Sequence, residues 1–209
     1  MQPKKEVNMS LYNVFVEGGV IMYPLLLCSI IVWAVAIEKI YFLKQIKTQL
    51  EVLFDRSEIL LKEKKISEAK GLVHNIHPII QGPYMSLFEE SASKQTADER
   101  LSRRLSEGNQ GLRRYLWLLG TIGSSAPFIG LFGTVVGIIK SFESISRAGK
   151  SGFATVAGDL SEALVATASG IVVAVMAVMF YNFFQSRLSS LNLFLKNRME
   201  DLNDLMQTK

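Results

Sequence analysis

Three stretches without a charged side chain constrain the fold of this chain more than any other feature of its sequence. They cover residues 18–37, 115–139 and 163–186 and are 20, 25 and 24 residues long. A helix rises about 1.5 Å per residue, so each stretch can cross a hydrocarbon core about 30 Å thick. Helices buried in a soluble core usually show a polar stripe or end sooner. We therefore interpret all three as transmembrane helices.

The first stretch is interpreted as a retained span and not as a cleaved signal peptide. Acidic Glu6 and Glu17 precede it, and no small-residue cleavage site follows before Glu38. Cys28, the one cysteine of the chain, lies inside this span. It can form no intramolecular disulfide, so a packed thiol is the expected role.

The distribution of basic residues predicts how the spans are oriented. Lys and Arg number two before the first span, fourteen between the first and second, three in residues 140–150 and four from Arg187 onward. The positive-inside rule places the long middle region and the C-terminal tail in the cytoplasm, and the N-terminus and the loop after Phe142 outside. Nucleic acid binding is disfavoured, because eleven acids are interleaved with the basic residues of the middle region.

The middle region, residues 38–114, carries 25 charged residues in 77, and its apolar positions recur at helical spacing. This pattern predicts helices that leave the membrane and fold back, with a break near Pro78. His74 and His77 could share a helix face and bind a metal, but no Cys, third His or suitable carboxylate joins them. A metal site is therefore not expected.

Sequence motifs of catalysis are not apparent. The segment AGKSG has Ser144 where a phosphate loop needs its first Gly, so it is interpreted as a plain outer loop. No acyl-transfer or kinase constellation is recognisable. We expect neither an enzyme nor a cofactor.

The second and third spans each place their small residues on one side. On a helix of about 100° per residue, the residues near the line of Gly130 are small or mildly polar, and bulky residues cover most of the remaining surface. Gly133 and Gly137 form a small-xxx-small pair that allows close helix packing. The residues that we expect to pack against a partner helix are Gly130, Gly133, Gly137, Ala163, Gly170 and Ala174.

Two threonines add polarity to these small faces. Thr134 lies six residues before Lys140, and Thr167 lies five residues after Glu162. If the two helices are antiparallel neighbours, both hydroxyls lie at a similar depth, about 8 Å below those charges. Several subunits would then form a polar ring. Each hydroxyl could instead bond to a carbonyl one turn back in its own helix.

Glu162 is the most informative single residue. A carboxylate at the membrane margin is costly unless it is paired, hydrated or protonated, and such acids are candidates for function. It lies about 140° around the helix from Thr167, so one can line a pore while the other faces a subunit interface. A cap at the start of the third span is the structural alternative for Glu162, and capping is the role we expect for Asp159 and Ser161. The three spans carry no carboxylate or His at mid-membrane, so a proton route would need an acid from another chain.

These segments resemble the ExbB/TolQ/MotA proton-channel family. The second span contains Gly-Leu-Phe-Gly-Thr-Val-x-Gly-Ile, the third contains Glu-Ala-Leu-x-Ala-Thr-Ala-x-Gly, and the first span resembles that of the ExbB/TolQ branch. One departure is Met176, where many relatives have Pro, so the third span is expected to be straighter.

The resemblance implies a pentamer whose second and third spans line a pore around the single spans of a dimeric ExbD/TolR-like partner. The partner's membrane Asp would bind and release protons, with Thr134, Thr167 and Glu162 at the matching pore positions. Proton flow would drive motion that is passed to a TonB- or TolA-like protein. The implied location is the bacterial inner membrane, with the N-terminus in the periplasm. The competing hypotheses are a structural membrane scaffold and, more distantly, a secondary transporter, which would need broken helices or a midplane polar site.

The sequence thus predicts an all-α polytopic membrane protein with three transmembrane helices and long cytoplasmic extensions, assembled as a homo-oligomer in the lipid bilayer. The expected segments are a periplasmic N-terminus at 1–19, spans at 20–37, 115–142 and 162–186, a cytoplasmic helical region at 38–114, a periplasmic loop at 143–161 and a cytoplasmic C-terminal helix at 187–209.

Overall fold

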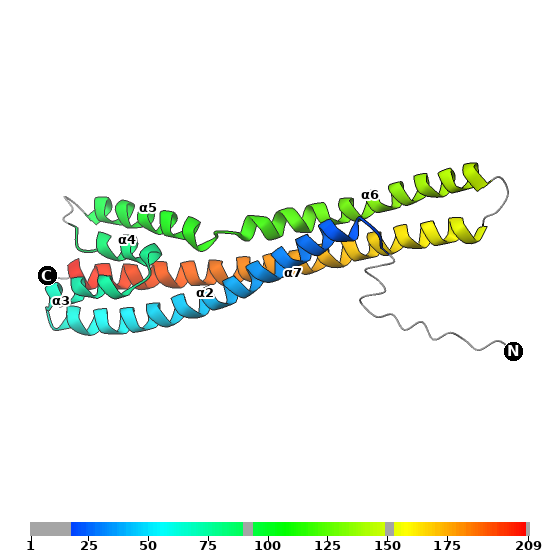
Figure 1. Cartoon of the computed structure of the whole chain (residues 1–209). Coiled ribbons are helices and arrows are strands. Elements are labelled where there is room, and N and C mark those ends of the chain that lie inside the picture. The colour runs from blue at the N-terminus through cyan, green and yellow to red at the C-terminus, as the bar shows by residue number, and fades with distance from the viewer. Residues whose placement is uncertain (1–17, 90–93, 149–152, 208–209) are drawn as a thin grey trace. The chain divides into compact units, whose positions relative to one another are not determined.

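Helices make up the fold throughout the described part of the chain. The structure, a computed structural model, describes residues 18–89, 94–148 and 153–207, and no strand occurs among them (Figure 1). The all-α prediction is confirmed. The helices are α2 (Met22–Lys62), α3 (Ile66–Gly71), the 3-10 helix η1 (Leu72–Asn75), α4 (Pro78–Ser86), α5 (Lys94–Leu112), α6 (Leu116–Ala148) and α7 (Phe153–Gln207).

Three of these helices, α2, α6 and α7, are long and apolar enough to cross a membrane. The most apolar windows of the three have mean hydropathies of 2.0, 1.8 and 2.4. The prediction of three apolar spans is confirmed, and each helix continues well beyond the uncharged stretch inside it. The orientation of the termini and the segment boundaries stay predictions.

The region expected to be an outer loop, residues 143–161, is largely helical. Helix α6 continues to Ala148 and α7 begins at Phe153, while residues 149–152 of the AGKSG segment lie outside the described residues. The prediction that Asp159 and Ser161 cap a helix is wrong, because both lie inside α7, more than one turn from its first residue. The capping alternative for Glu162 fails for the same reason.

The chain divides into two compact units. Unit 1 takes its described residues from Met1–Val35 and Leu118–Tyr181, and unit 2 consists of the described residues of Ala36–Trp117 and Asn182–Lys209. Helices α2 and α7 contribute to both units. Unit 1 contains the three uncharged stretches almost entirely, so the candidate site lies there.

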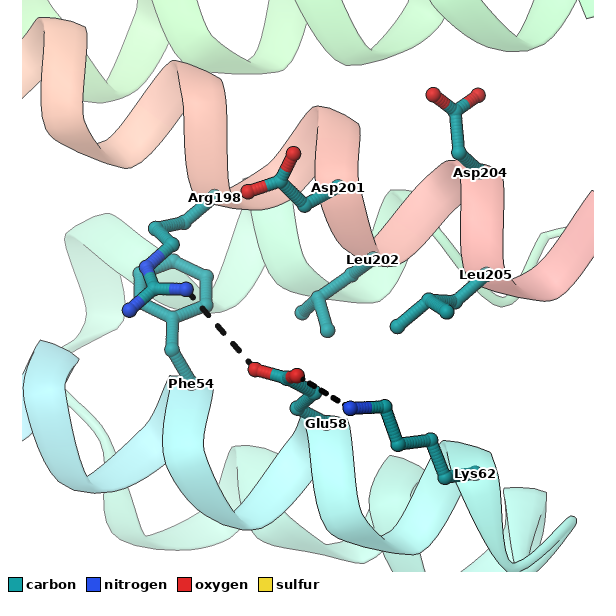
Figure 2. A pocket seen from close by; sticks show the side chains of 8 residues that line it. All are labelled: Phe54, Glu58, Lys62, Arg198, Asp201, Leu202, Asp204 and Leu205. Carbon is teal, nitrogen blue, oxygen red and sulfur yellow. Dashed lines mark hydrogen bonds and ion pairs between the residues drawn. The ribbon is translucent and has the colours of Figure 1, made fainter.

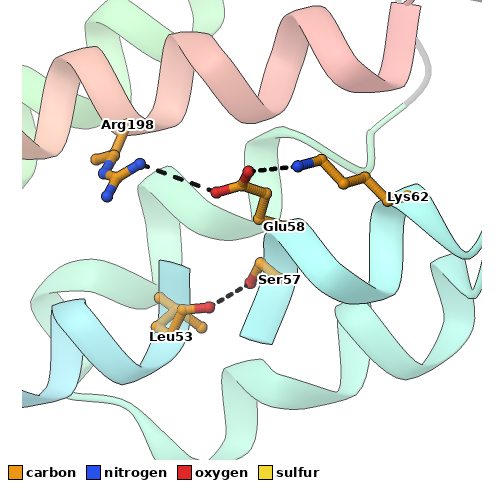
Figure 3. Close-up of polar contacts among 5 residues, drawn as sticks. All are labelled: Leu53, Ser57, Glu58, Lys62 and Arg198. Carbon is orange, nitrogen blue, oxygen red and sulfur yellow. Dashed lines mark hydrogen bonds and ion pairs between the residues drawn. The ribbon is translucent and has the colours of Figure 1, made fainter. Parts of the chain in front are cut away.

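Unit 2 has a core of leucine, isoleucine and aromatic side chains with a few buried polar ties. Tyr84 of α4 is fully buried, and its hydroxyl lies 2.8 Å from Ser57 Oγ and donates to Ala69 O at 2.7 Å. Ser57 in turn donates to Leu53 O at 2.7 Å (Figure 3). These bonds link α2, α3 and α4, and desolvation raises the pKa of Tyr84 above its usual value of 10.0.

Lys39 is the buried charge of this unit. Its side chain is 1% exposed, and Nζ donates to Leu112 O at 3.2 Å, lies 3.6 Å from Glu38 and sits over the Phe42 ring. Leu112 is the last residue of α5, where helix carbonyls lack partners and a cation is favourable. Lys39 thus fastens α2 to the end of α5.

The break expected near Pro78 is present. The 3-10 helix η1 ends at Asn75, and α4 begins with Pro78 at its first position. His77 caps α4, because its Nδ1 accepts a hydrogen bond from the Ile79 backbone N–H. Proline is well suited to the first turn of a helix, where its missing N–H costs nothing.

Candidate functional site

The small faces of α6 and α7 pack directly against one another within the chain. We call this contact the glycine seam, and α6 and α7 run side by side there (Figure 1). A Cβ added at Gly130 would lie 3.0 Å from Ala166 O, and one at Gly137 would lie 2.4 Å from Ala163 Cβ. A Cβ at Gly170 would lie 2.7 Å from Ala126 O. Backbone therefore meets backbone along the seam, as small residues permit between membrane helices.

The six residues expected to pack against a partner helix are all in this intrachain contact. Each of them is buried. Their neighbours in α6 and α7 of the same chain lie directly beside them. Packing against a partner helix stays a prediction. The full set is Gly130, Gly133, Gly137, Ala163, Gly170 and Ala174.

Thr167 forms a polar link across the glycine seam. Its hydroxyl donates to Gly130 O at 2.9 Å, joining residues 37 apart in the sequence. The close approach depends on Gly130, since a Cβ there would lie only 3.0 Å from the Thr167 Cα. A bond between membrane helices of this kind contributes about 0.6 kcal/mol on average.

Thr134 satisfies its hydroxyl within its own helix. The hydroxyl donates to Leu131 O at 2.6 Å, and the side chain is partly exposed. Thr134 lies four residues after Gly130, the residue that Thr167 contacts, so the threonines differ in depth by about one helical turn, roughly 6 Å. Each hydroxyl bonds to a carbonyl, and the local bond anticipated as an alternative is the one that Thr134 adopts.

The Glu162 side chain lies beside a cationic side chain of α6 and beside the turn that precedes α2. Its Oε1 lies 3.4 Å from Lys140 Nζ of α6, and its side chain is 36% exposed. The turn before α2 also approaches this carboxylate, since a Cβ added at Gly19 would lie 1.9 Å from the same oxygen. One turn further out, Ser144 Oγ donates to Asp159 Oδ2 at 3.3 Å, so a second polar link joins α6 and α7.

An apolar cavity lies beside these charges in unit 1. Phe132, Val136 and Ala166 are among its walls, and Lys140 and Glu162 are its two charged lining residues. Together these features place one acidic and one cationic side chain at one end of a mainly apolar cavity. No cluster of three metal-binding side chains occurs in the described residues.

Unit 2 has a separate open groove between α2 and α7 (Figure 2). Glu58 lies there between Lys62, at 2.7 Å, and Arg198, at 3.9 Å, with Phe54 and Leu202 close by. The hydrogen bond from Lys62 lowers the pKa of Glu58 below its usual value of 4.5. The charges are exposed and paired, so this groove has the character of a solvated surface and offers no buried reactive group.

Comparison with known proteins assigns the chain to a family. Residues 71–197 match the model of the MotA/TolQ/ExbB proton channel family. The chain belongs to this family. The matched region includes Thr134, Thr167 and Glu162, together with Lys140 and the whole glycine seam.

Several relatives similar to this chain are named biopolymer transport protein ExbB. The one from Pseudomonas putida is 36% identical over 179 residues, which is 82% of this chain and 54% of the relative. The one from Salmonella typhimurium is 30% identical over 199 residues, 88% of this chain and 81% of the relative. A Neisseria gonorrhoeae relative is 51% identical over 77 residues. The chain thus spans about half the length of the first relative and most of the second.

Two residues of the site were not predicted as functional. Lys140 marks the end of the second uncharged stretch, and Gly19 lies just before α2. The sequence did contain one indication of a role for Lys140. Lys140 and Glu162 carry opposite charges and lie at the facing ends of two consecutive spans. Nothing in the sequence indicated that Gly19 would contact Glu162, because they are 143 residues apart.

Proposed function

We propose that this chain is the channel subunit of an inner-membrane complex that uses the proton-motive force. In this proposal an ExbD/TolR-like partner supplies a membrane Asp, and the motion reaches a TonB- or TolA-like protein that acts on the outer membrane. The family and the three apolar helices support the channel role. The branch, TonB-dependent uptake or the Tol system, follows from whichever partner the chain binds.

The observation that carries the proposal is the arrangement of polar groups inside the family match. Thr134, Thr167 and Glu162 lie on two packed helices in a region where the three spans have no other acid and no His. Intramembrane polar groups usually mark ion pathways. Because no carboxylate lies at mid-span, the proton carrier has to come from the partner chain.

Assembly from several copies fits the surface of unit 1. Large apolar side chains are exposed on α6, including Phe128 at 70% and Phe132 at 59%, and on α7, including Met179 at 65%. Lipid or further copies of the chain can cover these faces, whereas the glycine seam is already filled. We propose a homo-oligomer, with a pentamer as the family's arrangement.

The test is proton flux into liposomes that contain the chain together with its single-span partner. Thr134→Val, Thr167→Val and Glu162→Ala are each expected to abolish flux while the oligomer survives size-exclusion chromatography. Val replaces only the hydroxyl and keeps the shape, so the glycine seam should remain closed. Full flux in all three variants would refute the pore assignment.

A structural scaffold without ion conduction is the second candidate, favoured by the backbone contacts of the glycine seam. It predicts that Gly133→Leu or Gly137→Leu destroys assembly, since a Cβ at either position would lie within 3 Å of an alanine Cβ. It also predicts that the Thr and Glu variants behave as wild type. The two sets of variants therefore separate the two functions.

A further inference from the structure

We propose that Lys140 and Gly19 are positioning residues that hold the Glu162 carboxylate at the charged end of the apolar cavity of unit 1. The functional value of this arrangement rests on the proposed channel role. The arrangement itself can be tested without that role.

We call Lys140 and Gly19 together the holder of Glu162, and Lys140 is its first part. It is the first charged residue after the second uncharged stretch, and Glu162 is the last one before the third, so the two charges meet at one level of neighbouring helices. Their atoms are 3.4 Å apart, and both side chains are only partly exposed, at 48% and 36%. A carboxylate at this position without a cation would be costly in a membrane. Lys140 supplies that cation from the same chain.

The second half is the turn at Gly19. Its φ of +63° belongs to the left-handed region, which Gly adopts without strain. A Cβ at this position would lie 1.9 Å from Glu162 Oε1 and 2.8 Å from its Cδ. Any other residue would force the Glu162 side chain to move, so the absence of a side chain at Gly19 provides the space for the carboxylate.

The lining of the cavity shows which groups surround the Glu162 carboxylate. Its walls include Ile21 before α2, Phe132 of α6 and Ala166 of α7, and Glu162 lines it together with Lys140. The Glu162 carboxylate therefore lies beside the turn that precedes α2, within the lining of this cavity. Replacement of either Lys140 or Gly19 should let the Glu162 carboxylate leave this location.

The experiment is carbodiimide labelling of Glu162 in the full chain with its partner in membrane vesicles, followed by mass spectrometry. Lys140→Met should speed labelling about fivefold, the factor that corresponds to an ion pair worth about 1 kcal/mol. Gly19→Ala should also speed labelling, because the added methyl group would overlap the Glu162 carboxylate and displace it. Lys140→Arg keeps the cation and should label at the wild-type rate. Only protein that elutes at the wild-type oligomer size is analysed.

Two matched controls distinguish the positioning of Glu162 from a general loosening of the contact between α6 and α7. Ser144→Ala removes the neighbouring polar link between α6 and α7, and Gly158→Ala adds a methyl group on α7 where nothing lies within 4 Å. Both should label as wild type. The proposal is overturned if Lys140→Met labels at the wild-type rate, or if Ser144→Ala accelerates labelling as much as Lys140→Met.

Proton flux in the same vesicles distinguishes this proposal from the proposed function. Faster labelling with reduced flux supports both. Faster labelling with wild-type flux supports the holder and contradicts a role of Glu162 in conduction. Unchanged labelling overturns the holder, whatever the flux. The double variant Lys140→Glu with Glu162→Lys restores the pair in reverse, so it should keep the oligomer but not the flux.

Discussion

The helix contacts of the two units differ in the size of the side chains that form them. In unit 1, α6 and α7 meet through glycine and alanine, and backbone atoms touch across the glycine seam. In unit 2, the buried residues are large, among them Leu53, Tyr84 and Leu195, and hydroxyls and an ammonium group tie them together. The contrast follows from the solvent. Apolar side chains gain little free energy by moving from lipid into a helix contact, so membrane helices associate by close packing. In water, by contrast, the burial of large apolar groups drives folding.

This contrast predicts different weaknesses. The glycine seam should be sensitive to the size of a side chain and tolerant of losing a hydroxyl. Unit 2 should be sensitive to the loss of a buried polar tie and tolerant of changes to its exposed ion pairs. Four substitutions test this difference, in decreasing order of expected effect.

The largest effect is expected for Gly170→Leu. The added side chain would meet backbone atoms, Ala126 O at 2.7 Å and Gly130 Cα at 3.1 Å, which cannot turn aside. Overpacking typically costs about 1–3 kcal/mol, and a whole Leu side chain against fixed backbone belongs at the upper end, so we expect no folded oligomer in detergent extracts. Gly158→Leu is the control, because its side chain would enter open space. A folded Gly170→Leu protein would show that the seam can open.

Tyr84→Phe should have the next largest effect. It removes the donor to Ala69 O and the contact to Ser57 inside a buried site, at a cost of about 1–3 kcal/mol. Thermal unfolding in detergent measures the loss. The variant Tyr41→Phe, at a side chain that is 71% exposed, provides the control.

The same tyrosine gives a pH dependence. Its pKa is raised in the folded state, so the folded protein holds the phenolic proton more tightly than the unfolded chain does. This contribution to stability is complete below pH 10 and is lost as the pH rises through the folded-state pKa. Wild type should therefore lose stability more steeply than Tyr84→Phe in that range. Parallel curves would contradict the assigned burial.

Thr167→Val should change stability little. The hydroxyl bond to Gly130 O is worth about 0.6 kcal/mol, and Val preserves the shape at the seam. Thermal unfolding should shift by a correspondingly small amount, even though proton flux is expected to disappear. A collapse of the fold would mean that the threonine is a structural tie and would remove the argument for its role in a pore.

The smallest effect is expected for Glu58→Gln in the open groove of unit 2. Both partners of Glu58 are exposed, and exposed pairs contribute little. Its pKa is lowered, so its small contribution is present above about pH 4.5 and fades as the pH falls. No melting shift should be resolved at neutral pH. A clear loss there would show that the groove is a structural contact of unit 2.

The sequence predicted the spans and their small faces because both follow from helical geometry and the absence of charge. It did not predict what the small faces touch, since a helical projection gives a direction and not a neighbour. Gly130 and Gly170 were therefore expected beside a partner helix, and the structure shows that each lies against the other's helix within the chain. The helical start of α7 was missed because Asp159 and Ser161 resemble caps, although polar residues at a membrane margin do not by themselves end a helix. The pair of Lys140 and Glu162 was missed because it forms only once the two helices are packed.

The central claim is that unit 1 conducts protons through polar groups held on a closed glycine seam. Proton flux into liposomes containing the chain and its single-span partner tests it most directly, with wild type, Thr167→Val and Ser144→Ala measured side by side. We predict flux in wild type and in Ser144→Ala and none in Thr167→Val, with all three oligomers intact. Equal flux in all three, or no partner-dependent flux in wild type, would contradict it.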